Sequence, residues 1–393
     1  MNRQAMKEAF IQQFGGSSES IRCFYAPGRV NLIGEHTDYN GGYVFPAALT
    51  FGTTMLIRPR SDREIRLASG NFELQGTIDL DRAEYVKEEE WINYPKGILV
   101  HLQKNGYTFG GYDVYYYGNI PNGAGLSSSA SLQLVTAFGF MSMEGHPIDR
   151  VELALVAQRS ENEFLGVKCG IMDQFTVAMG KRDHALLLKC NTLDYEPVPF
   201  DSRGYKLVIG NTNKRRGLVD SEYNMRRSQC EQAAQELRAK HPGLQLLGEL
   251  DLDQFEDSQS CIKEETVRKR AQHVIEENDR VLKSVEALKK NDLPEFGRLM
   301  TASHDSLRDL YEVTCRELDV MVEEALQVDG VLGSRMTGAG FGGCTVSLVR
   351  EDAVDAFIRQ VGTAYQDKTG LQADFYVASI GDGVSELADC YIN

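Results

Sequence analysis

Three stretches of the chain combine glycine with residue types that bind anions or hydroxyl groups. Residues 26–38 (APGRVNLIGEHTD) bring an arginine close to a glutamate, a histidine and an aspartate; residues 121–130 (PNGAGLSSSA) place three serines behind a glycine turn; and residues 337–343 (TGAGFGG) are rich in glycine. Carboxylates accept hydrogen bonds from hydroxyls, and glycine lets backbone N–H groups approach an anion closely. Together the stretches predict an enzyme that binds phosphate beside a polyhydroxylated substrate.

The central stretch lies between a predicted strand and a predicted helix. Residues 112–117 (YDVYYY) are β-branched or aromatic, and residues 131–143 lack proline and carry apolar side chains at helical spacing. The first-turn amides and the dipole of such a helix favour an anion. Its serines could cap the helix, donate to phosphate oxygens or ligate Mg²⁺. No lysine follows the second glycine, so this is not a Walker A loop, and the phosphate charge must be met by amides, a metal ion and an arginine from elsewhere. The alternative is an ordinary serine-capped helix.

The downstream stretch matches the G-x-G-x-x-G pattern of dinucleotide-binding domains. That fingerprint opens a helix near the start of a βαβ unit, whereas residues 344–349 (CTVSLV) predict a strand. We therefore interpret the loop as a site of tight packing or as a backbone wall that lines a ligand cleft.

The upstream stretch concentrates polar side chains on an irregular segment. Glu35 and Asp38 offer acceptors to a sugar rim, and His36 lies between them. The His-x-Asp pair could ligate a metal instead, but no further histidine or cysteine cluster supports a zinc site. A solvated turn with capping carboxylates is the other alternative, and Arg29, six residues before Glu35, favours a binding site over it.

The three stretches resemble the signature motifs of the GHMP kinase superfamily. Residues 28–39 (GRVNLIGEHTDY) are similar to the galactokinase signature in particular, and the likeness extends to residues 169–174 (CGIMDQ) and 221–224 (SEYN). The resemblance implies an α+β fold with two lobes, a ferredoxin-like C-terminal lobe and an active site between the lobes. It also implies an ATP-dependent sugar kinase that phosphorylates the C1 hydroxyl of galactose to galactose 1-phosphate, the first committed step of galactose metabolism.

The resemblance implies a role for each matching residue. The sugar-binding residues are Glu35, His36, Thr37, Asp38 and Tyr223. The nucleotide-binding residues are Ser69, Gly123, Ala124, Gly125, Leu126, Ser127, Ser128 and Ser129. The Mg²⁺ cofactor maps to Ser129 and Glu161.

The implied catalytic residues are Asp173, which faces the C1 hydroxyl, and Arg29 beside it. Phosphoryl transfer needs positioning and charge neutralisation more than covalent chemistry, and its loose transition state needs little nucleophile charge early. We therefore expect Asp173 to orient the hydroxyl and take its proton late. Arg29 would stabilise the developing negative charge.

Length and pattern predict how these motifs are arranged. A chain of 393 residues suits two lobes, which we expect at residues 1–180 and 181–393, with a last strand that could return to the first lobe. We predict strands near 21–33, 43–58, 112–118, 184–190 and 205–212, and helices near 1–14, 128–143 and 149–165. A long helix should follow, with a buried stripe made of Val267, Ala271, Val274, Val281, Leu282, Val285 and Leu288.

Composition limits the partners and the compartment. A net charge of -15 argues against a nucleic-acid partner, because that affinity comes largely from cationic contacts with phosphate. The cysteines are scattered without a C-x-x-C pair, which indicates free thiols in a reducing cytoplasm. No apolar run reaches the roughly 18 residues that span a bilayer. We expect galactose and ATP as small-molecule partners, with no membrane and no obligate protein partner.

Two other hypotheses stay open. One is a kinase of the same superfamily with a different acceptor, such as N-acetylgalactosamine, mevalonate or homoserine. The other is a non-catalytic sugar sensor that binds ATP and galactose. Galactokinase-like sensors lose residues from the serine loop, whereas residues 127–130 (SSSA) are complete here.

Overall fold

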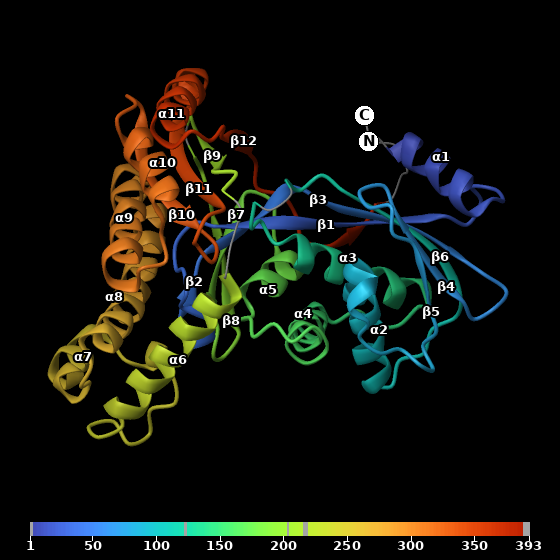
Figure 1. Cartoon of the computed structure of the whole chain (residues 1–393), viewed down its shortest axis with the longest axis horizontal. Coiled ribbons are helices and arrows are strands. Elements are labelled where there is room, and N and C mark those ends of the chain that lie inside the picture. The colour runs from blue at the N-terminus through green and yellow to red at the C-terminus, as the bar shows by residue number, and fades with distance from the viewer. Residues whose placement is uncertain (1–2, 122–123, 203, 215–218, 388–393) are drawn as a thin grey trace.

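The computed structural model describes residues 3–121, 124–202, 204–214 and 219–387. It has two lobes, and the long strand β1 runs from one to the other (Figure 1). The N-terminal lobe is built on a six-stranded sheet in the order β13-β1-β3-β6-β4-β5. These strands are β1 (Arg22–Asn31), β3 (Pro46–Pro59), β4 (Ile65–Ser69), β5 (Gly76–Ile78), β6 (Tyr112–Gly118) and β13 (Ser385–Glu386).

The two faces of this sheet are covered by different helices. Successive side chains of a strand point to opposite faces, so Phe24 and Met55 lie in the larger core while their neighbours Cys23 and Leu56 pack in a smaller one. The smaller core is closed by α1 (Arg3–Phe14). The larger core is closed by α2 (Asn93–Lys104), α3 (Ser128–Met143), α4 (Arg150–Arg159) and α5 (Met172–Met179).

The C-terminal lobe is a four-stranded antiparallel sheet in the order β10-β11-β9-β12, backed by helices (Figure 1). Its strands are β9 (Tyr205–Asn211), β10 (Val331–Thr337), β11 (Cys344–Arg350) and β12 (Asp374–Ala378). Its helices are α6 (Val219–Leu237), α7 (Leu252–Ser258), α8 (Glu265–Lys289), α9 (Leu293–Ser306), α10 (Arg316–Leu326) and α11 (Val354–Thr369). A small sheet of β2 (Tyr43–Val44), β7 (His184–Lys189) and β8 (Asp194–Pro199) lies between the lobes.

One hydrophobic core joins the two lobes. The end of β1 contributes Val30, which packs in the same cluster as Val281 of α8 and Val346 of β11. The C-terminal strand also returns to the first lobe, because Phe24 and Tyr25 of β1 pair with Glu386 and Ser385 of β13. The chain therefore crosses between the lobes at both of its ends.

Most of the elements expected from sequence are confirmed. The segment expected as one helix near 149–165 is α4 followed by a π-helical turn over Ser160–Phe164. The buried stripe of α8 is confirmed for six of its members, which are Val267, Ala271, Val274, Val281, Val285 and Leu288. The prediction for Leu282 is wrong, because its side chain is 41% exposed. Leu282 directly follows Val281, and neighbouring positions on a helix lie about 100° apart.

Candidate active site

The strand β1 aims Arg29 at the serine loop through an irregularity in its pairing with β3. Pro27 pairs with Gly52 and Arg29 with Ala48, so the register shifts at Gly28. A β-bulge of this kind re-aims a side chain. Gly28 also allows the loop to come close, because a Cβ there would lie 2.7 Å from the carbonyl oxygen of Leu126. Arg29 is buried, and its Nη1 donates to the carbonyl of Gly125 over 2.7 Å.

Asp173 lies in the first turn of α5 and has two side-chain partners. Its Oδ1 is 2.9 Å from Arg29 Nη2, and its Oδ2 accepts a hydrogen bond from Ser127 Oγ over 2.5 Å. Ser127 precedes α3 with a left-handed φ of 62° and makes no side-chain cap of that helix. The capping hypothesis is therefore wrong for Ser127. Its hydroxyl instead holds the carboxylate of Asp173 beside the helix N-terminus.

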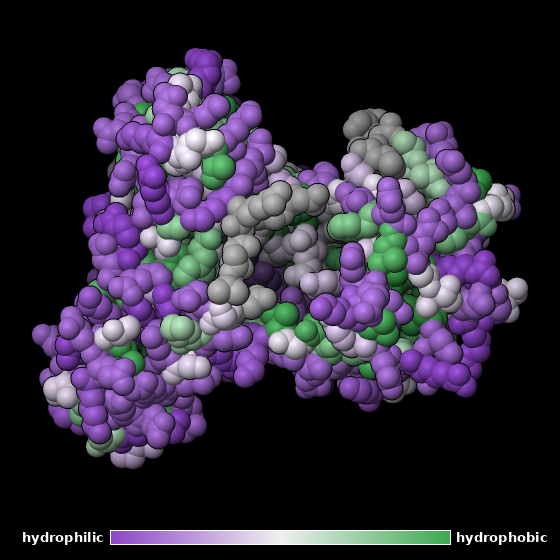
Figure 2. All heavy atoms as spheres, viewed as in Figure 1, coloured by the Kyte–Doolittle hydropathy of each residue, from purple (hydrophilic) through white to green (hydrophobic). Residues whose placement is uncertain are grey.

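These residues open onto a cavity of about 220 Å³ between the lobes. The N-terminal lobe contributes Arg29, Glu161 and Asp173, and Tyr223 comes from α6. Gly338 and Ala339 form part of the wall, as expected for a glycine loop that lines a cleft. From the segment after β1, the lining includes Glu35, His36, Asp38 and Tyr39. Figure 2 shows this face of the molecule hollowed between the lobes.

Glu35 is fixed in the cavity wall by the C-terminal lobe. Its Oε1 accepts from the backbone N–H of Gly338 over 2.8 Å and lies 3.3 Å from Nη1 of Arg335, which is fully buried. Arg335 also donates to the carbonyl of Asn31 at the end of β1. The pair therefore joins β10 to the segment that holds the candidate sugar-binding residues.

Asp38 is a partly buried carboxylate whose charge is only partly compensated by its surroundings. Burial raises the pKa of its carboxyl to about 6, and the nearby charge of Asp173 adds to the shift. Gly170 packs directly on it, because a Cβ at residue 170 would lie 1.9 Å from Asp38 Oδ2. The carboxylate accepts a hydrogen bond from the backbone N–H of Tyr39, and the hydroxyls of a bound sugar could supply further donors.

Thr37 differs from its neighbours. Its hydroxyl is 2.9 Å from the carbonyl of Gly34 and 2.6 Å from that of Tyr43, its side chain is fully buried, and it does not line the cavity. The structure thus brings Glu35, His36 and Asp38 together with Tyr223 and places Thr37 behind them, where it holds the turn.

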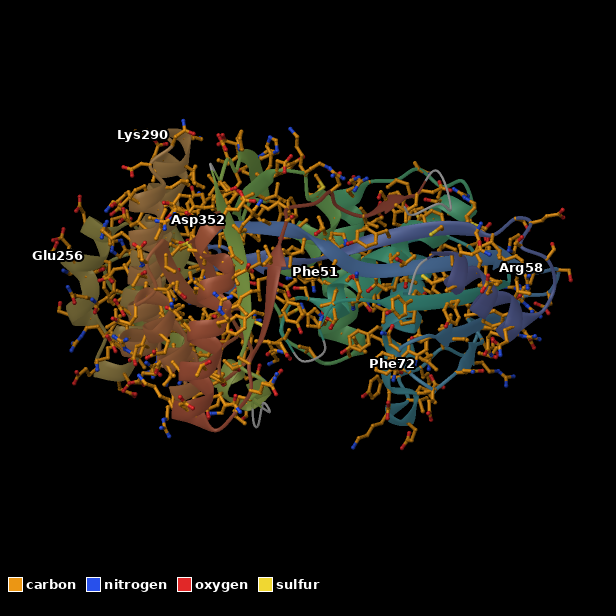
Figure 3. The ribbon with its side chains drawn as sticks, turned by 90° about the horizontal axis from the view of Figure 1, so that it is seen from above. Phe51, Arg58, Phe72, Glu256, Lys290 and Asp352 are labelled. Atoms are coloured by element: carbon orange, nitrogen blue, oxygen red, sulfur yellow. The ribbon has the colours of Figure 1, made fainter. Side chains whose placement is uncertain are left out.

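A second cavity of about 170 Å³ lies on the other side of the start of α3. It is lined by Ser69, Ser128 and Ser129 together with a group of aromatic side chains made of Phe72, Trp91, Tyr94 and Tyr116. The Phe72 and Trp91 rings are stacked, with centroids 6.2 Å apart and planes at 19°. Figure 3 shows Phe72 on the N-terminal lobe, away from the helices of the C-terminal lobe. Sequence reasoning missed this aromatic group, because apolar ring pockets have no spacing signature.

The serine loop lies between the two cavities. Ser127 contacts Asp173 in the first cavity, whereas Ser128 and Ser129 line the second. Ser69 lies across the second cavity, where its Oγ accepts from the backbone N–H of Asn71 over 3.1 Å. Ala124, Gly125 and Leu126 lead into the loop, and Gly123 lies outside the described residues.

Glu161 is an acidic group near both cavities, and no cationic side chain among the residues that the structure describes forms an ion pair with it. Its Oε2 accepts from Gln174 Nε2 over 2.7 Å, and Ser129 also hydrogen-bonds to the carboxylate. Burial raises the pKa of Glu161 to about 7, and the charge of Asp173 contributes. Such an oxygen set suits a hard divalent cation. Over the described ranges, however, no three histidine, cysteine or acidic side chains are grouped to hold a metal ion by themselves.

An ion-paired aspartate at one cavity, with an aromatic-lined cavity across a serine loop and two α+β lobes around them, fits a small-molecule kinase of the GHMP type. The profile for the N terminal domain of GHMP kinases matches residues 93–181, and that for their C terminal domain matches residues 284–367. The galactokinase galactose-binding signature matches residues 8–59. The chain belongs to the galactokinase family of ATP-dependent sugar kinases.

Relatives of the chain support this assignment over nearly its whole length. It is 51% identical to a galactokinase of Bacillus subtilis over 98% of this chain and 99% of that protein. It is 52% identical to a galactokinase of Fusobacterium nucleatum over 94% and 96% of the two chains. Its structure is similar to that of Lactococcus lactis galactokinase complexed with galactose, with a TM-score of 0.95, 45% identity and coverage of 98% and 99%. These matches confirm the predicted two-lobed α+β fold.

A more distant likeness concerns the fold alone. The mevalonate kinase of Methanococcus jannaschii superposes with a TM-score of 0.68 at 20% identity, over 93% of this chain and all of that one. Among the residues that the structure describes, no helix combines the length and the apolar character needed to cross a membrane.

Proposed function

We propose that this protein transfers the terminal phosphoryl group of ATP to the C1 hydroxyl of galactose. The observation that carries the proposal is the cavity in which the Arg29–Asp173 pair faces the polar cluster of Glu35, His36 and Asp38. The structure of the Lactococcus lactis galactokinase complexed with galactose supports the choice of sugar. The product is galactose 1-phosphate, which feeds galactose metabolism.

We assign Asp173 the role of orienting the acceptor hydroxyl and accepting its proton late in the reaction. Arg29 and Ser127 hold the carboxylate at both oxygens, which restricts its rotation. Arg29 has a second function in this scheme, because a fixed guanidinium stabilises negative charge on the transferred group. Galactose itself would be held by Glu35, His36, Asp38 and Tyr223, with Thr37 supporting the turn.

The nucleotide would occupy the aromatic cavity and reach across the start of α3. The stacked rings of Phe72 and Trp91 offer a surface for adenine, and Ser69 and Ser128 lie at the same cavity. The N-terminal amides of α3 favour the phosphates. The γ-phosphoryl group would then point past Ser127 toward Asp173.

Mg²⁺ bound with ATP would be held by Ser129 and Glu161. The buried carboxylate of Glu161 without a cation beside it fits such an ion, and the small number of protein ligands is typical of Mg²⁺ that also binds substrate phosphates. The ion would supply neutralisation of the phosphate charge.

We also propose the division of the chain near residue 180, since the match to the N terminal domain ends at residue 181. None of the cysteines that the structure describes forms a disulfide, which supports a reducing compartment such as the cytoplasm.

The test is ADP release from Mg-ATP with galactose, N-acetylgalactosamine, glucose and mevalonate, each at saturating concentration. We expect fast turnover with galactose and a loss of at least about 10³-fold in kcat for Asp173→Asn. Turnover only with another acceptor would keep the superfamily and overturn the sugar assignment. Galactose binding without turnover would favour the sensor hypothesis.

A further inference from the structure

His36 has hydrogen-bond partners at both ring nitrogens. Nε2 is 3.2 Å from the carbonyl oxygen of Ala339, and Nδ1 is 2.8 Å from the hydroxyl of Tyr39. A carbonyl oxygen only accepts hydrogen bonds, so Nε2 must carry the proton. Burial lowers the pKa of His36 to about 3, with a further contribution from His273, so the ring is neutral at pH 7. Nδ1 is then an acceptor, and Tyr39 must donate to it.

The same reasoning fixes the direction of the next hydrogen bonds. The single proton of the Tyr39 hydroxyl points at His36, so its oxygen accepts from the hydroxyl of Tyr311 over 2.7 Å. The oxygen of Tyr311 can then only accept from the thiol of Cys230, 3.1 Å away. The carbonyl oxygen of Ala339 thus sets the direction of each hydrogen bond in a series of side chains that runs from His36 to Cys230, in the core of the C-terminal lobe.

Packing holds this chain of side chains in place. Tyr311 is fully buried in a π-helical turn over Leu307–Tyr311, and its ring lies between those of His36 and His273 at centroid distances of 4.8 and 4.5 Å. His273 is itself anchored, because its Nε2 lies 3.2 Å from the carbonyl oxygen of Glu35. The ring plane of His36 is therefore restricted from two sides.

This arrangement has a consequence for the ligand. His36 and Ala339 both line the cavity, and the Nε2–H of His36 donates to the carbonyl oxygen of Ala339. A single sugar hydroxyl could share that proton in a three-centre hydrogen bond and donate its own proton to the second lone pair of the carbonyl oxygen. If the proton lay on Nδ1, two acceptors would face the same hydroxyl and one would stay unpaired.

We propose that Tyr39 is a positioning residue that fixes the ring of His36 by donating to Nδ1, so that the Nε2–H set by the Ala339 carbonyl is presented to one hydroxyl of the sugar, and that Tyr311 supports it. The proposal rests on the proposed function and adds a specificity element to the sugar site. Tyr311 does not line the cavity, so its contribution passes through Tyr39. The Tyr311 proton occupies the Tyr39 oxygen and leaves the Tyr39 proton for His36.

The first test is kinetic and uses phenylalanine variants, which delete only the hydroxyl. We expect Tyr39→Phe to raise the KM for galactose about 5- to 30-fold, because Nδ1 loses its partner, with kcat and the KM for ATP within about twofold of the parent. Tyr311→Phe should raise the KM for galactose about 2- to 5-fold and add nothing in the Tyr39→Phe background. If the two substitutions raised the KM for galactose independently, so that their effects multiplied in the double variant, the proposed order of hydrogen bonds from Tyr311 through Tyr39 to His36 would be wrong.

A matched control is Tyr365→Phe. Tyr365 is also fully buried in the C-terminal lobe, and its hydroxyl donates to the carbonyl of Thr212 over 2.7 Å, away from the cavity. It should leave the KM for galactose unchanged. A rise equal to that of Tyr311→Phe would mean that loss of any buried hydroxyl acts on the site through stability alone.

Galactose analogues that each lack one hydroxyl identify the hydroxyl that contacts His36. The ratio of the KM of Tyr39→Phe to the KM of the parent should be close to one for the single analogue that lacks this hydroxyl, and it should stay raised for the other analogues. The same KM ratio for every analogue would overturn the proposal.

The tautomer itself can be read without any sugar. Nitrogen NMR of the full chain with ¹⁵N-labelled histidine should show His36 protonated at Nε2 in the parent and in Tyr39→Phe, and the signal of the unprotonated Nδ1 should shift in Tyr39→Phe because that nitrogen loses its hydrogen-bond donor. An unchanged Nδ1 signal in Tyr39→Phe, or protonation at Nδ1 in the parent, would contradict the assigned role even if galactose turnover is normal. Absence of galactose turnover in the parent would instead refute the proposed function and leave the tautomer result standing.

Discussion

The Ser127 hydroxyl donates a hydrogen bond to the Asp173 carboxylate over 2.5 Å. Ser127 is the last residue before helix α3, and Asp173 lies in the first turn of helix α5. The contact joins the loop at the proposed nucleotide cavity to the carboxylate at the proposed sugar cavity. In the proposed function, the position of the acceptor hydroxyl and the position of the phosphates are therefore coupled through a single side chain. This coupling is the basis of the first prediction.

Removal of the Ser127 hydroxyl should slow the chemical step. We expect Ser127→Ala to lower kcat about 5- to 50-fold, because Asp173 loses one of its two charge-assisted partners. Ser127→Gly is the matched variant, since it also lacks the hydroxyl but accepts the φ of 62° without strain. The two variants should share the same kcat, while thermal unfolding should show Ser127→Ala less stable than Ser127→Gly by about 1 kcal/mol. Normal turnover in both variants would show that Arg29 alone suffices to hold Asp173.

Asp38 should limit the stability of the free enzyme at neutral pH. The raised pKa of about 6 means that the folded state binds this proton more tightly than the unfolded state, in which the pKa of an aspartate carboxyl is ordinarily 3.8. The ionised carboxylate therefore costs folding free energy above pH 6, and this cost fades as the pH falls toward 3.8. We expect Asp38→Asn to raise the unfolding free energy at pH 8 by about 1–3 kcal/mol and to have little effect near pH 4.

The measurement is thermal unfolding of both proteins across this pH range without sugar. Asp38→Asn should also raise the KM for galactose, because an amide offers one acceptor oxygen in place of two. A variant that is less stable than the parent at pH 8 would contradict the assigned strain on the carboxylate.

Gly170→Ala should damage sugar binding selectively. A Cβ at residue 170 would lie 1.9 Å from Asp38 Oδ2, so Asp38 must move out of its place in the cavity wall. We expect the KM for galactose to rise at least about tenfold while the KM for ATP stays within about twofold. Gly243→Ala serves as the control, since nothing lies within 4 Å of a Cβ there. Equal changes in both KM values would indicate general unfolding of the loop and not displacement of Asp38.

Phe72→Ala should weaken the nucleotide site alone. The ring is 49% exposed and stacks on Trp91, so its loss costs little core packing. We expect the KM for ATP to rise about 2- to 12-fold and the KM for galactose to stay constant, as measured by steady-state kinetics with each substrate varied in turn. Removal of Leu252, which is 37% exposed on α7, is the control for deleting an exposed apolar side chain. An unchanged KM for ATP would place the adenine elsewhere.

The sequence predicted the parts of the site that depend on local motifs. Glu35, His36 and Asp38 stand within four residues of one another, so their proximity follows from the chain itself. The long apolar pattern of α8 also predicted which of its residues are buried, except at Leu282. Leu282 lies at the edge of the buried stripe, where the sequence pattern does not show whether a side chain is buried or exposed.

Partners that come from distant segments could not be predicted from spacing. Arg335 pairs with Glu35 across 300 residues of sequence, and Tyr311 reaches Tyr39 across 272. The aromatic cavity could not be predicted for the same reason, because Phe72 and Trp91 come into contact only once the N-terminal lobe has folded. The contact between Ser127 and Asp173 could not be predicted for a related reason. A serine before a helix often caps it, but here the left-handed backbone turns the hydroxyl toward α5.

The return of β13 to β1 also determines when the N-terminal sheet can be finished. Phe24 pairs with Glu386, so one edge of the strand that carries Arg29 stays open during synthesis until nearly the whole chain has been made. An open strand edge is a template for pairing with other chains. Until residues 385 and 386 pair with it, this edge of β1 is exposed to other chains, and we expect truncation before residue 385 to produce aggregation and not a smaller active enzyme.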